Sequence, residues 1–190
     1  MGDPQRTKAA ILVAAERLIS EKGFPALTLE EVAARASVSK GGLLHHFSSK
    51  AALVNGLTDR MIALHEQDIE GYRQQDPAAP GAYTRAYIRV TLACADKCSQ
   101  VCAAMSAEAK NFPGIVERFH AYSEKCDARL AADGLEPTVA FVARYAAEGL
   151  MSAASSGMPR PANYDVVTKH LLTLAGGGPV PRTKKAKQKQ

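Results

Sequence analysis

The sequence predicts an all-α protein of about nine helices, and three observations support this prediction. No segment shows the sustained alternation of apolar and polar residues that is typical of a strand. Apolar residues instead recur three and four positions apart, as in Ile11, Ala14, Ala15 and Leu18. Glycine and proline separate these periodic segments, most clearly at residues 76–81, Asp-Pro-Ala-Ala-Pro-Gly.

The first elements are expected to be three helices within residues 1–50. Asp3 or Thr7 can cap the first helix, which Gly23 ends. Thr28 and Glu31 have the spacing of a capping box, in which each side chain satisfies a backbone donor of the other. Ser39 can cap a further short helix. The apolar residues of that helix, expected to face mostly inward, are Leu43, Leu44 and Phe47.

Two short helices joined by a turn of about three residues make a helix-turn-helix, which places its second helix in the DNA major groove. The alternative is an ordinary helical hairpin with a weak second helix. Gly41 and Gly42 favour this alternative, because each glycine inside a helix lowers the stability of the helix by roughly 1 kcal/mol relative to alanine. A close approach of the backbone to a partner surface is one reason to tolerate them.

The later segments predict a second group of helices. A long helix is expected from Ser48 or Ser49 to about Arg73, with an apolar stripe of Leu53, Leu57, Met61 and Leu64. Two more follow, one from about Ala82 and one over residues 98–110. Another is expected over 115–132, with Val116, Phe119, Tyr122 and Cys126 on one face. The last two begin near Glu136-Pro137, where the helix is rich in apolar residues, and near Asn163.

Composition bounds the class of protein. The chain has 190 residues, 46% of them apolar, and no run of 18 or more apolar residues. We therefore expect a soluble, cytoplasmic protein with no membrane partner. The net charge is +5, but residues 182–190 contain five basic residues and no acid. The folded body is thus expected to be neutral, with residues 176–190 forming a disordered basic tail, so any affinity for DNA must come from local placement of charge.

Residues 6–57 resemble the DNA-binding region of the TetR family of one-component transcriptional regulators. The similar segments are Ile11-Leu12-x-Ala14-Ala15-x-x-Leu18-Ile19-x-x-x-Gly23, Thr28-Leu29-x-x-Val32-Ala33, and Ser37-Val38-Ser39-Lys40-Gly41-Gly42-Leu43-Leu44-His45-His46-Phe47-x-x-Lys50-x-x-Leu53. The resemblance implies a DNA-binding domain over 1–50, with the helix-turn-helix at about 27–47, and a helical ligand-binding and dimerisation domain over 51–175. It also implies a homodimer formed through the last two helices. That dimer would be a repressor that a small-molecule effector releases from double-stranded operator DNA.

Candidate DNA contacts divide into those that position the protein and those that read bases. The hydroxyls of Thr28, Ser37 and Ser39 and the ammonium of Lys50 suit phosphates. Lys40 suits guanine O6 or N7. The remaining candidates on the second helix are Gly41, Gly42, His45 and His46. Leu44 stands where the family often has tyrosine, so one common phosphate contact is missing.

The resemblance places a small-molecule site among the middle helices, where aromatic residues and methionine suit an adaptable apolar cavity. The candidates are His65, Tyr87, Cys98, Cys102, Met105, Phe112, Phe119, Tyr122, Phe141 and Tyr145. An aromatic stripe at helical spacing is also typical of an ordinary core.

Cys94, Cys98 and Cys102 are four residues apart and would form one stripe on a continuous helix. Such cysteines can simply pack as small apolar residues. They can also act as a thiol sensor or a soft-metal site, which would make the protein a thiol- or metal-responsive transcriptional sensor. Because the sequence lacks a phosphate loop, GxSxG, HExxH or an obvious carboxylate pair, we predict no enzyme, no cofactor and no dedicated metal site.

Overall fold

The computed structural model describes residues 3–76, 80–97 and 99–176, and within these ranges it is all-α. The described elements are α1 (Pro4–Lys22), the 3-10 helix η1 (Phe24–Ala26), α2 (Leu29–Arg35), α3 (Lys40–His46), α4 (Lys50–Gln75), α5 (Ala82–Lys97), α6 (Ser99–Ala107), α7 (Pro113–Ala131), α8 (Pro137–Ser155) and α9 (Tyr164–Leu174). The all-α prediction, with about nine helices, is confirmed over these ranges. None of the described helices has the length and apolar character needed to cross a membrane.

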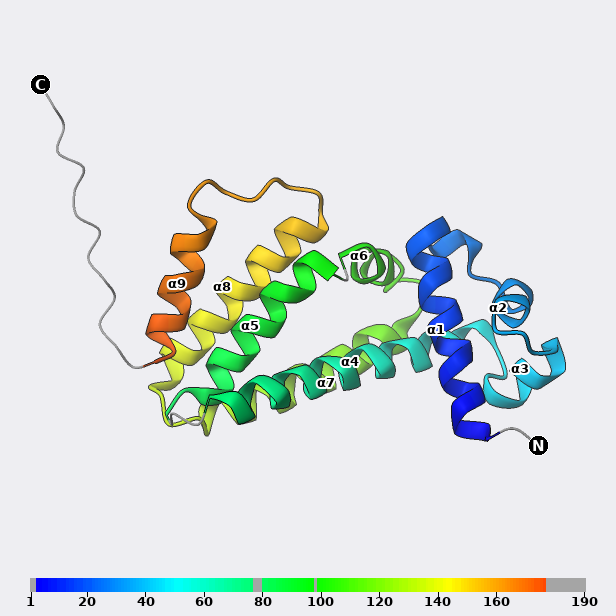
Figure 1. Cartoon of the computed structure of the whole chain (residues 1–190), viewed down its shortest axis with the longest axis horizontal. Helices are drawn as coiled ribbons and strands as arrows, with labels where there is room; N and C mark the ends of the chain where they lie inside the picture. The colour runs from blue at the N-terminus through cyan, green and yellow to red at the C-terminus, as the bar shows by residue number, and fades with distance from the viewer. Residues whose placement is uncertain (1–2, 77–79, 98, 177–190) are drawn as a thin grey trace, which may run out of the picture.

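The helices form two groups at opposite ends of an elongated molecule (Figure 1). Helices α1, α2 and α3 make one end, and α5, α8 and α9 make the other. The long helix α4, with α7 beside it, runs between the two groups. Of the predicted tail, residues 177–190 lie outside the described residues.

Short polar side chains start most of the N-terminal helices. Asp3, Ser39 and Ser49 accept hydrogen bonds from backbone N–H groups at the starts of α1, α3 and α4. The capping box at α2 is half formed. Thr28 Oγ1 accepts from the Glu31 N–H at 3.2 Å. The Glu31 carboxylate does not return the bond, because it pairs with Lys22 at 3.3 Å while the Thr28 N–H donates to the Ala26 carbonyl.

The first core joins α1, α2 and α3 to the start of α4. Leu43 and Phe47 are buried here among apolar side chains of α1, as their expected inward orientation predicted. The same core includes Val101 and Met105 of α6 and Ile115 of α7. The N-terminal group is therefore held to the rest of the molecule by α6 and α7 as well as by α4.

The second group is organised around α5, which packs against both α4 and α8. The Asp133 carboxylate, from the loop before α8, accepts hydrogen bonds from the Tyr83 and Thr84 N–H groups at 3.0 and 2.8 Å. The buried Arg85 guanidinium pairs with Asp76 at 2.7 Å and donates to the Ala175 carbonyl at 2.9 Å. These bonds connect the end of α4, the start of α5 and the end of α9.

Two predicted apolar faces are partly wrong. Leu64 on α4 is exposed and Ile69 is buried instead, because α4 packs on α1 in its first half and on α5 and α7 further along. On α7, Val116 and Phe119 are exposed, whereas the buried residues are Ile115, Cys126 and Leu130. The buried stripe of α7 follows the helical period but starts one position earlier than predicted.

Candidate nucleic-acid interface and interior polar cluster

Helices α2 and α3 form the predicted helix-turn-helix. The chain reverses at Ser37, which has a positive φ of 55°. The Val38 N–H then donates to the Ala33 carbonyl at 3.0 Å, and the Val38 side chain packs against the first core. The turn is therefore held from both its backbone and its side chain, and the angle between α2 and α3 is fixed by local contacts.

Helix α3 has one buried side and one exposed side. Leu43 is fully buried, and Phe47, four residues later, lies on the same side. Gly41, Leu44 and His45 are exposed. The prediction that Leu44 faces inward is wrong, because its side chain is 37% exposed. In a helix of seven residues, Leu43 and Phe47 fill the core side, and Leu44 lies about 100° further round.

The two glycines of α3 have different surroundings. A Cβ on Gly42 would lie 3.2 Å from Ser39 Oγ, the atom that accepts the Gly42 N–H at 3.0 Å. Gly42 thus makes room for the cap of α3. A Cβ on Gly41 would meet no atom closer than 4.0 Å, so local packing does not require a glycine at this exposed position.

Both lysines that the sequence predicts as DNA contacts have partners within the protein. Lys50 Nζ lies 4.9 Å from the centroid of the Phe24 ring. Lys40 Nζ lies 2.5 Å from Glu30 Oε1. Thr28, Ser37 and Ser39 are exposed, while His46 is partly buried beside His45. Sequence reasoning missed Glu30, although an acidic residue in the first turn of α2 is a visible signal.

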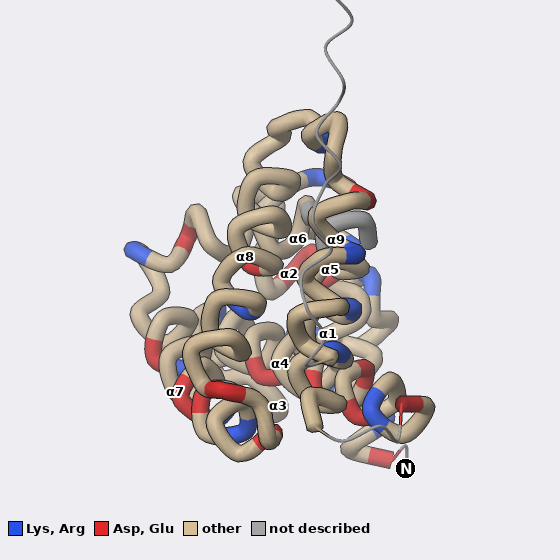
Figure 2. Tube along the Cα trace, turned by 90° about the vertical axis from the view of Figure 1, so that its left-hand side faces the viewer, with Lys and Arg blue, Asp and Glu red and all other residues tan. Residues whose placement is uncertain are grey.

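Charge on the described body is mixed, as the sequence predicted. Acidic and basic positions are interspersed along the chain in the view of Figure 2. The Glu21–Arg35 pair (2.7 Å) and the Lys22–Glu31 pair (3.3 Å) both lie at the surface of the N-terminal group. Individual exposed residues, rather than a broad basic face, therefore define the candidate interface.

A cluster of polar side chains lies in the interior between α4, α5, α7 and α8. His65 Nδ1 is 2.7 Å from the Tyr122 hydroxyl, and the His65 ring packs edge-on against the rings of Tyr87 and Tyr122. The Tyr87 hydroxyl donates to Glu148 Oε1 at 2.5 Å, and Arg144 Nε donates to the same oxygen at 2.7 Å. Five side chains from four helices thus form one connected group.

Burial sets the protonation states in this cluster. Burial lowers the pKa of His65, so its imidazole is neutral at pH 7 and carries one donor and one acceptor nitrogen. Burial also raises the pKa of Tyr87 and of Tyr122, and both phenols stay protonated. Burial opposes the charged form of Arg144, yet its pKa is raised because Glu148 accepts from the guanidinium and Asp127 pairs with it.

The structure brings together only some of the predicted ligand-binding residues. His65, Tyr87 and Tyr122 meet in the interior cluster, and Phe141 packs beside them. Met105 and Phe112 belong to the first core, where the Phe112 ring centroid is 5.5 Å from that of Phe24. Phe119 and Tyr145 are exposed, Cys102 is partly buried on α6, and Cys98 lies outside the described residues.

Arg144 and Glu148 were missed by sequence reasoning. Their signal is a pair of opposite charges four residues apart in an otherwise apolar helix. Such a pair is commonly a surface feature, and only the packing of α7 and α5 over it shows that Arg144 is buried.

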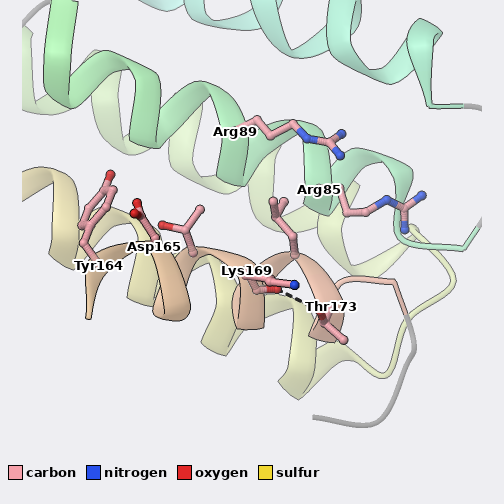
Figure 3. Close-up of a pocket in the computed structure, with 8 residues that line it drawn as sticks. Arg85, Arg89, Tyr164, Asp165, Lys169 and Thr173 are labelled. Atoms are coloured by element: carbon pink, nitrogen blue, oxygen red, sulfur yellow. Dashed lines mark hydrogen bonds between the residues drawn. The ribbon is translucent and has the colours of Figure 1, made fainter. Parts of the chain in front are cut away.

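A separate open groove of about 400 Å³ lies between α5 and α9 (Figure 3). Its lining residues are Arg85, Arg89, Tyr164, Asp165, Thr168, Lys169, Leu172 and Thr173. Two of its cations already pair with Asp76, Arg85 at 2.7 Å and Arg89 at 3.3 Å. None of the residues predicted from the sequence to bind a ligand lines this groove.

The predicted cysteine stripe does not form on one helix. Cys94 belongs to α5, which ends at Lys97, and Cys102 belongs to α6, which begins at Ser99. The change of helix direction between them removes the common face (Figure 1). Among the residues that the structure describes, no group of three or more histidine, cysteine or acidic side chains is placed to hold a metal ion.

Comparison with known proteins identifies both parts of the chain. Residues 11–57 match the family model described as bacterial regulatory proteins, tetR family. Residues 81–176, half of the chain, match the model described as tetracyclin repressor-like, C-terminal domain.

Curated relatives match mainly the N-terminal part. The HTH-type transcriptional regulator TtgR of Pseudomonas putida is 33% identical over 78 residues, which are 41% of this chain and 37% of that protein. RutR of Escherichia coli K12 is 36% identical over 85 residues, 45% of this chain and 39% of that protein. The matched part is thus well under half the length of these relatives.

Solved structures match the whole fold. A transcriptional regulator from Rhodococcus sp. Rha1 has a TM-score of 0.70 and 22% identity, covering 90% of this chain and 94% of its own. The multidrug binding protein EbrR, complexed with imidazole, has a TM-score of 0.66 and 23% identity, covering 95% and 99%. At these identities the likeness shows the fold.

Proposed function

Because the chain belongs to the TetR family of bacterial regulatory proteins, we propose that it is a homodimeric transcriptional repressor that binds operator DNA and is released by a small-molecule effector. The observation that carries the DNA-binding part is the two-sided helix α3. Leu43 and Phe47 anchor α3 in the first core, while Gly41, Leu44 and His45 present an exposed side with little bulk at its start. This is the arrangement by which a recognition helix enters a major groove.

In this proposal α3 reads base edges and its neighbours hold the backbone. Leu44 offers an apolar contact to a thymine methyl group, and Lys40 offers its ammonium to guanine. Lys50 and the exposed hydroxyl of Thr28 lie at the N-termini of α4 and α2, where phosphates are favoured, and Ser37 offers its exposed hydroxyl from the turn between α2 and α3. Because α3 is short, sequence reading would depend on few side chains.

An exposed apolar face supports the proposed dimer. On α8, Val142 and Tyr145 are 56% and 59% exposed, and Gly149 on the same side has no neighbour within 4 Å of its Cβ position. Val166 on α9, which packs on α8, is also exposed. Large apolar side chains grouped on adjoining helices are typical of a surface that is covered by a partner. A second copy of α8 and α9 would complete a four-helix interface.

The interior cluster is the proposed effector site. His65, Tyr122 and Tyr87 offer hydrogen-bonding groups among aromatic rings, which suits a small molecule with a few polar atoms. His65 lies on α4, and α4 begins at Lys50, directly after α3. A ligand that displaces α4 would therefore also move α3. It lowers operator affinity only if it binds the displaced state more tightly.

The test of DNA binding is selection from a random duplex library with the purified full-length protein. We expect enrichment of a roughly palindromic site whose halves are about one helical turn apart. The variants His45→Ala and Lys50→Ala should then weaken binding about tenfold or more in fluorescence anisotropy. Lys125→Ala, on α7, is the matched control. Failure to enrich any sequence, or equal binding by all three variants, would reject the proposal.

The test of the effector site is a thermal-shift screen with small aromatic compounds. A compound that raises the melting temperature by mass action should also release the selected duplex. Tyr122→Phe and His65→Phe each retain an aromatic ring but remove hydrogen-bonding groups, so they should weaken this response. Phe119→Leu, on the exposed side of α7, should not. A compound whose effect survives both interior substitutions binds elsewhere.

A further inference from the structure

An exposed ion pair joins Glu30 to Lys40, at the start of the recognition helix. Lys40 Nζ and Glu30 Oε1 are 2.5 Å apart, although the two side chains are 58% and 63% exposed. The hydrogen bond from Lys40 lowers the pKa of Glu30, so the carboxylate stays charged at any physiological pH.

The pair lies on the side of the molecule that the proposed function assigns to DNA. Lys40 is the first residue of α3, and Glu30 is in the first turn of α2, two residues after the Thr28 cap. The adjacent acid, Glu31, faces elsewhere, toward Lys22 and Arg35. Glu30 is therefore the acidic side chain of α2 that contacts the recognition helix.

We propose that Glu30 sets the operator affinity by competing with DNA for Lys40. This inference rests on the proposed DNA-binding function. Lys40 cannot donate fully to guanine or to a phosphate while its ammonium is held by the carboxylate. Each binding event must either exchange this ion pair for a contact with DNA or proceed without Lys40. In both cases the bound complex is weaker than it would be with an unpaired lysine.

The competition should lower affinity for the operator at least as much as it lowers affinity for unrelated DNA. On the selected operator, a base edge with two acceptors replaces the carboxylate, so the full strength of the ion pair is subtracted from binding. On unrelated DNA, Lys40 can stay paired with Glu30 when no good acceptor is in reach. The loss of binding free energy caused by Glu30 is then equal to that on the operator or smaller. Glu30 thus limits affinity without adding specificity. When operator affinity is moderate, an effector can release the protein even if it binds the DNA-free state only modestly more tightly than the DNA-bound state.

The experiment measures binding of full-length protein to the selected duplex and to an unrelated duplex of equal length by fluorescence anisotropy. Glu30→Gln frees Lys40 and should tighten operator binding about twofold to fivefold, which lies within the range expected for an exposed ion pair. The gain on the unrelated duplex should be no larger. Glu21→Gln is the matched control, because it removes the same charge from the Glu21–Arg35 pair on the other side of α2.

A double-mutant cycle separates competition from simple charge repulsion. If Glu30 acts through Lys40, the gain from Glu30→Gln should largely disappear in a Lys40→Ala background. A gain that persists there, or one that equals the effect of Glu21→Gln, would overturn the inference. Both side chains are exposed, so circular dichroism should show that all variants are folded. A wild-type protein that binds no selected duplex would instead overturn the proposed function itself.

Discussion

The two ends of the molecule handle polar groups in opposite ways. Among the described residues, every buried polar or charged side chain lies at or after Thr58, and the set is Thr58, Thr84, Arg85, Thr91 and Arg144. The core around α1, α2 and α3 is apolar, and its ion pairs, such as Glu21–Arg35 and Glu30–Lys40, are at the surface. The N-terminal end therefore has its polar and charged side chains at the surface, whereas the C-terminal end buries several of them.

This difference fits the two tasks proposed for the protein. A surface that reads DNA needs exposed donors on a rigid apolar base. A site that recognises a small molecule needs polar groups in a largely apolar interior, where each hydrogen bond discriminates strongly. Buried polar groups also cost free energy when they lose a partner, so the C-terminal group should be more sensitive to polar substitutions and the N-terminal group to apolar ones.

The largest expected effect tests the apolar base of the DNA-binding end. Leu43→Ala removes a fully buried side chain, and we expect the free energy of unfolding to fall by about 3–4 kcal/mol because a cavity is left in the first core. Leu44→Ala, one residue later and exposed, should change stability little while weakening DNA binding. Urea unfolding followed by circular dichroism, with anisotropy on the selected duplex, distinguishes the two. Equal losses of stability would show that α3 does not have the two sides described.

The next effect tests the interior polar cluster. Arg144→Met leaves Glu148 and Asp127 without their buried cation, and we expect a loss of about 2–3 kcal/mol, since both carboxylates keep some contact with water. Arg35→Met is the counterpart in the N-terminal group, where the Arg35–Glu21 pair is at the surface. Its effect on urea unfolding should be much smaller. The comparison of the two ends fails if both arginines prove equally important.

The N-terminal end can be predicted from the sequence better than the C-terminal end, because its contacts join residues that are close in the sequence. The helix-turn-helix depends on local spacing, since Thr28 caps α2, Ser39 caps α3, and Leu43 and Phe47 are four residues apart. Spacing along the sequence is enough to predict these positions. Leu44 was misplaced because a helix of seven residues has too few positions to show which side the core occupies.

The interior cluster could not be predicted in this way. Its bonds join residues 57 apart, as between His65 and Tyr122, and 61 apart, as between Tyr87 and Glu148. No periodic pattern links such positions; only the packing of four helices does. The cysteine stripe failed for a related reason, because a spacing of four implies a common face only while one helix continues.

Two glycines on α4, Gly56 and Gly71, allow the packing around the two halves of this helix to be compared directly. A Cβ on Gly56 would lie 2.6 Å from Phe47 Cε1 and 3.3 Å from Leu12 Cδ2, so Gly56→Ala should destabilise the protein by about 1–2 kcal/mol through overpacking of the first core. A Cβ on Gly71, in the second half of the same helix, meets nothing within 4 Å. Gly71→Ala should therefore raise stability by about 0.5–1 kcal/mol. Thermal and urea unfolding of both variants would reveal whether their effects have opposite signs.

The last expected effect is a pH dependence of stability that belongs to the C-terminal end. Hydrogen bonding from Arg85 lowers the pKa of Asp76 from 3.8 to about 2. A carboxyl group with a lowered pKa in the folded state contributes stability that is fully present above pH 4 and is lost as the pH falls toward 2. Asp76→Asn should thus lower the free energy of unfolding at pH 6 by about 1 kcal/mol, allowing for the partial exposure of the carboxylate, and by less at pH 2. Urea midpoints measured from pH 6 to pH 2 should converge for the two proteins. Parallel curves would mean that the Asp76–Arg85 pair does not hold the end of α4 to α5 as the structure has it.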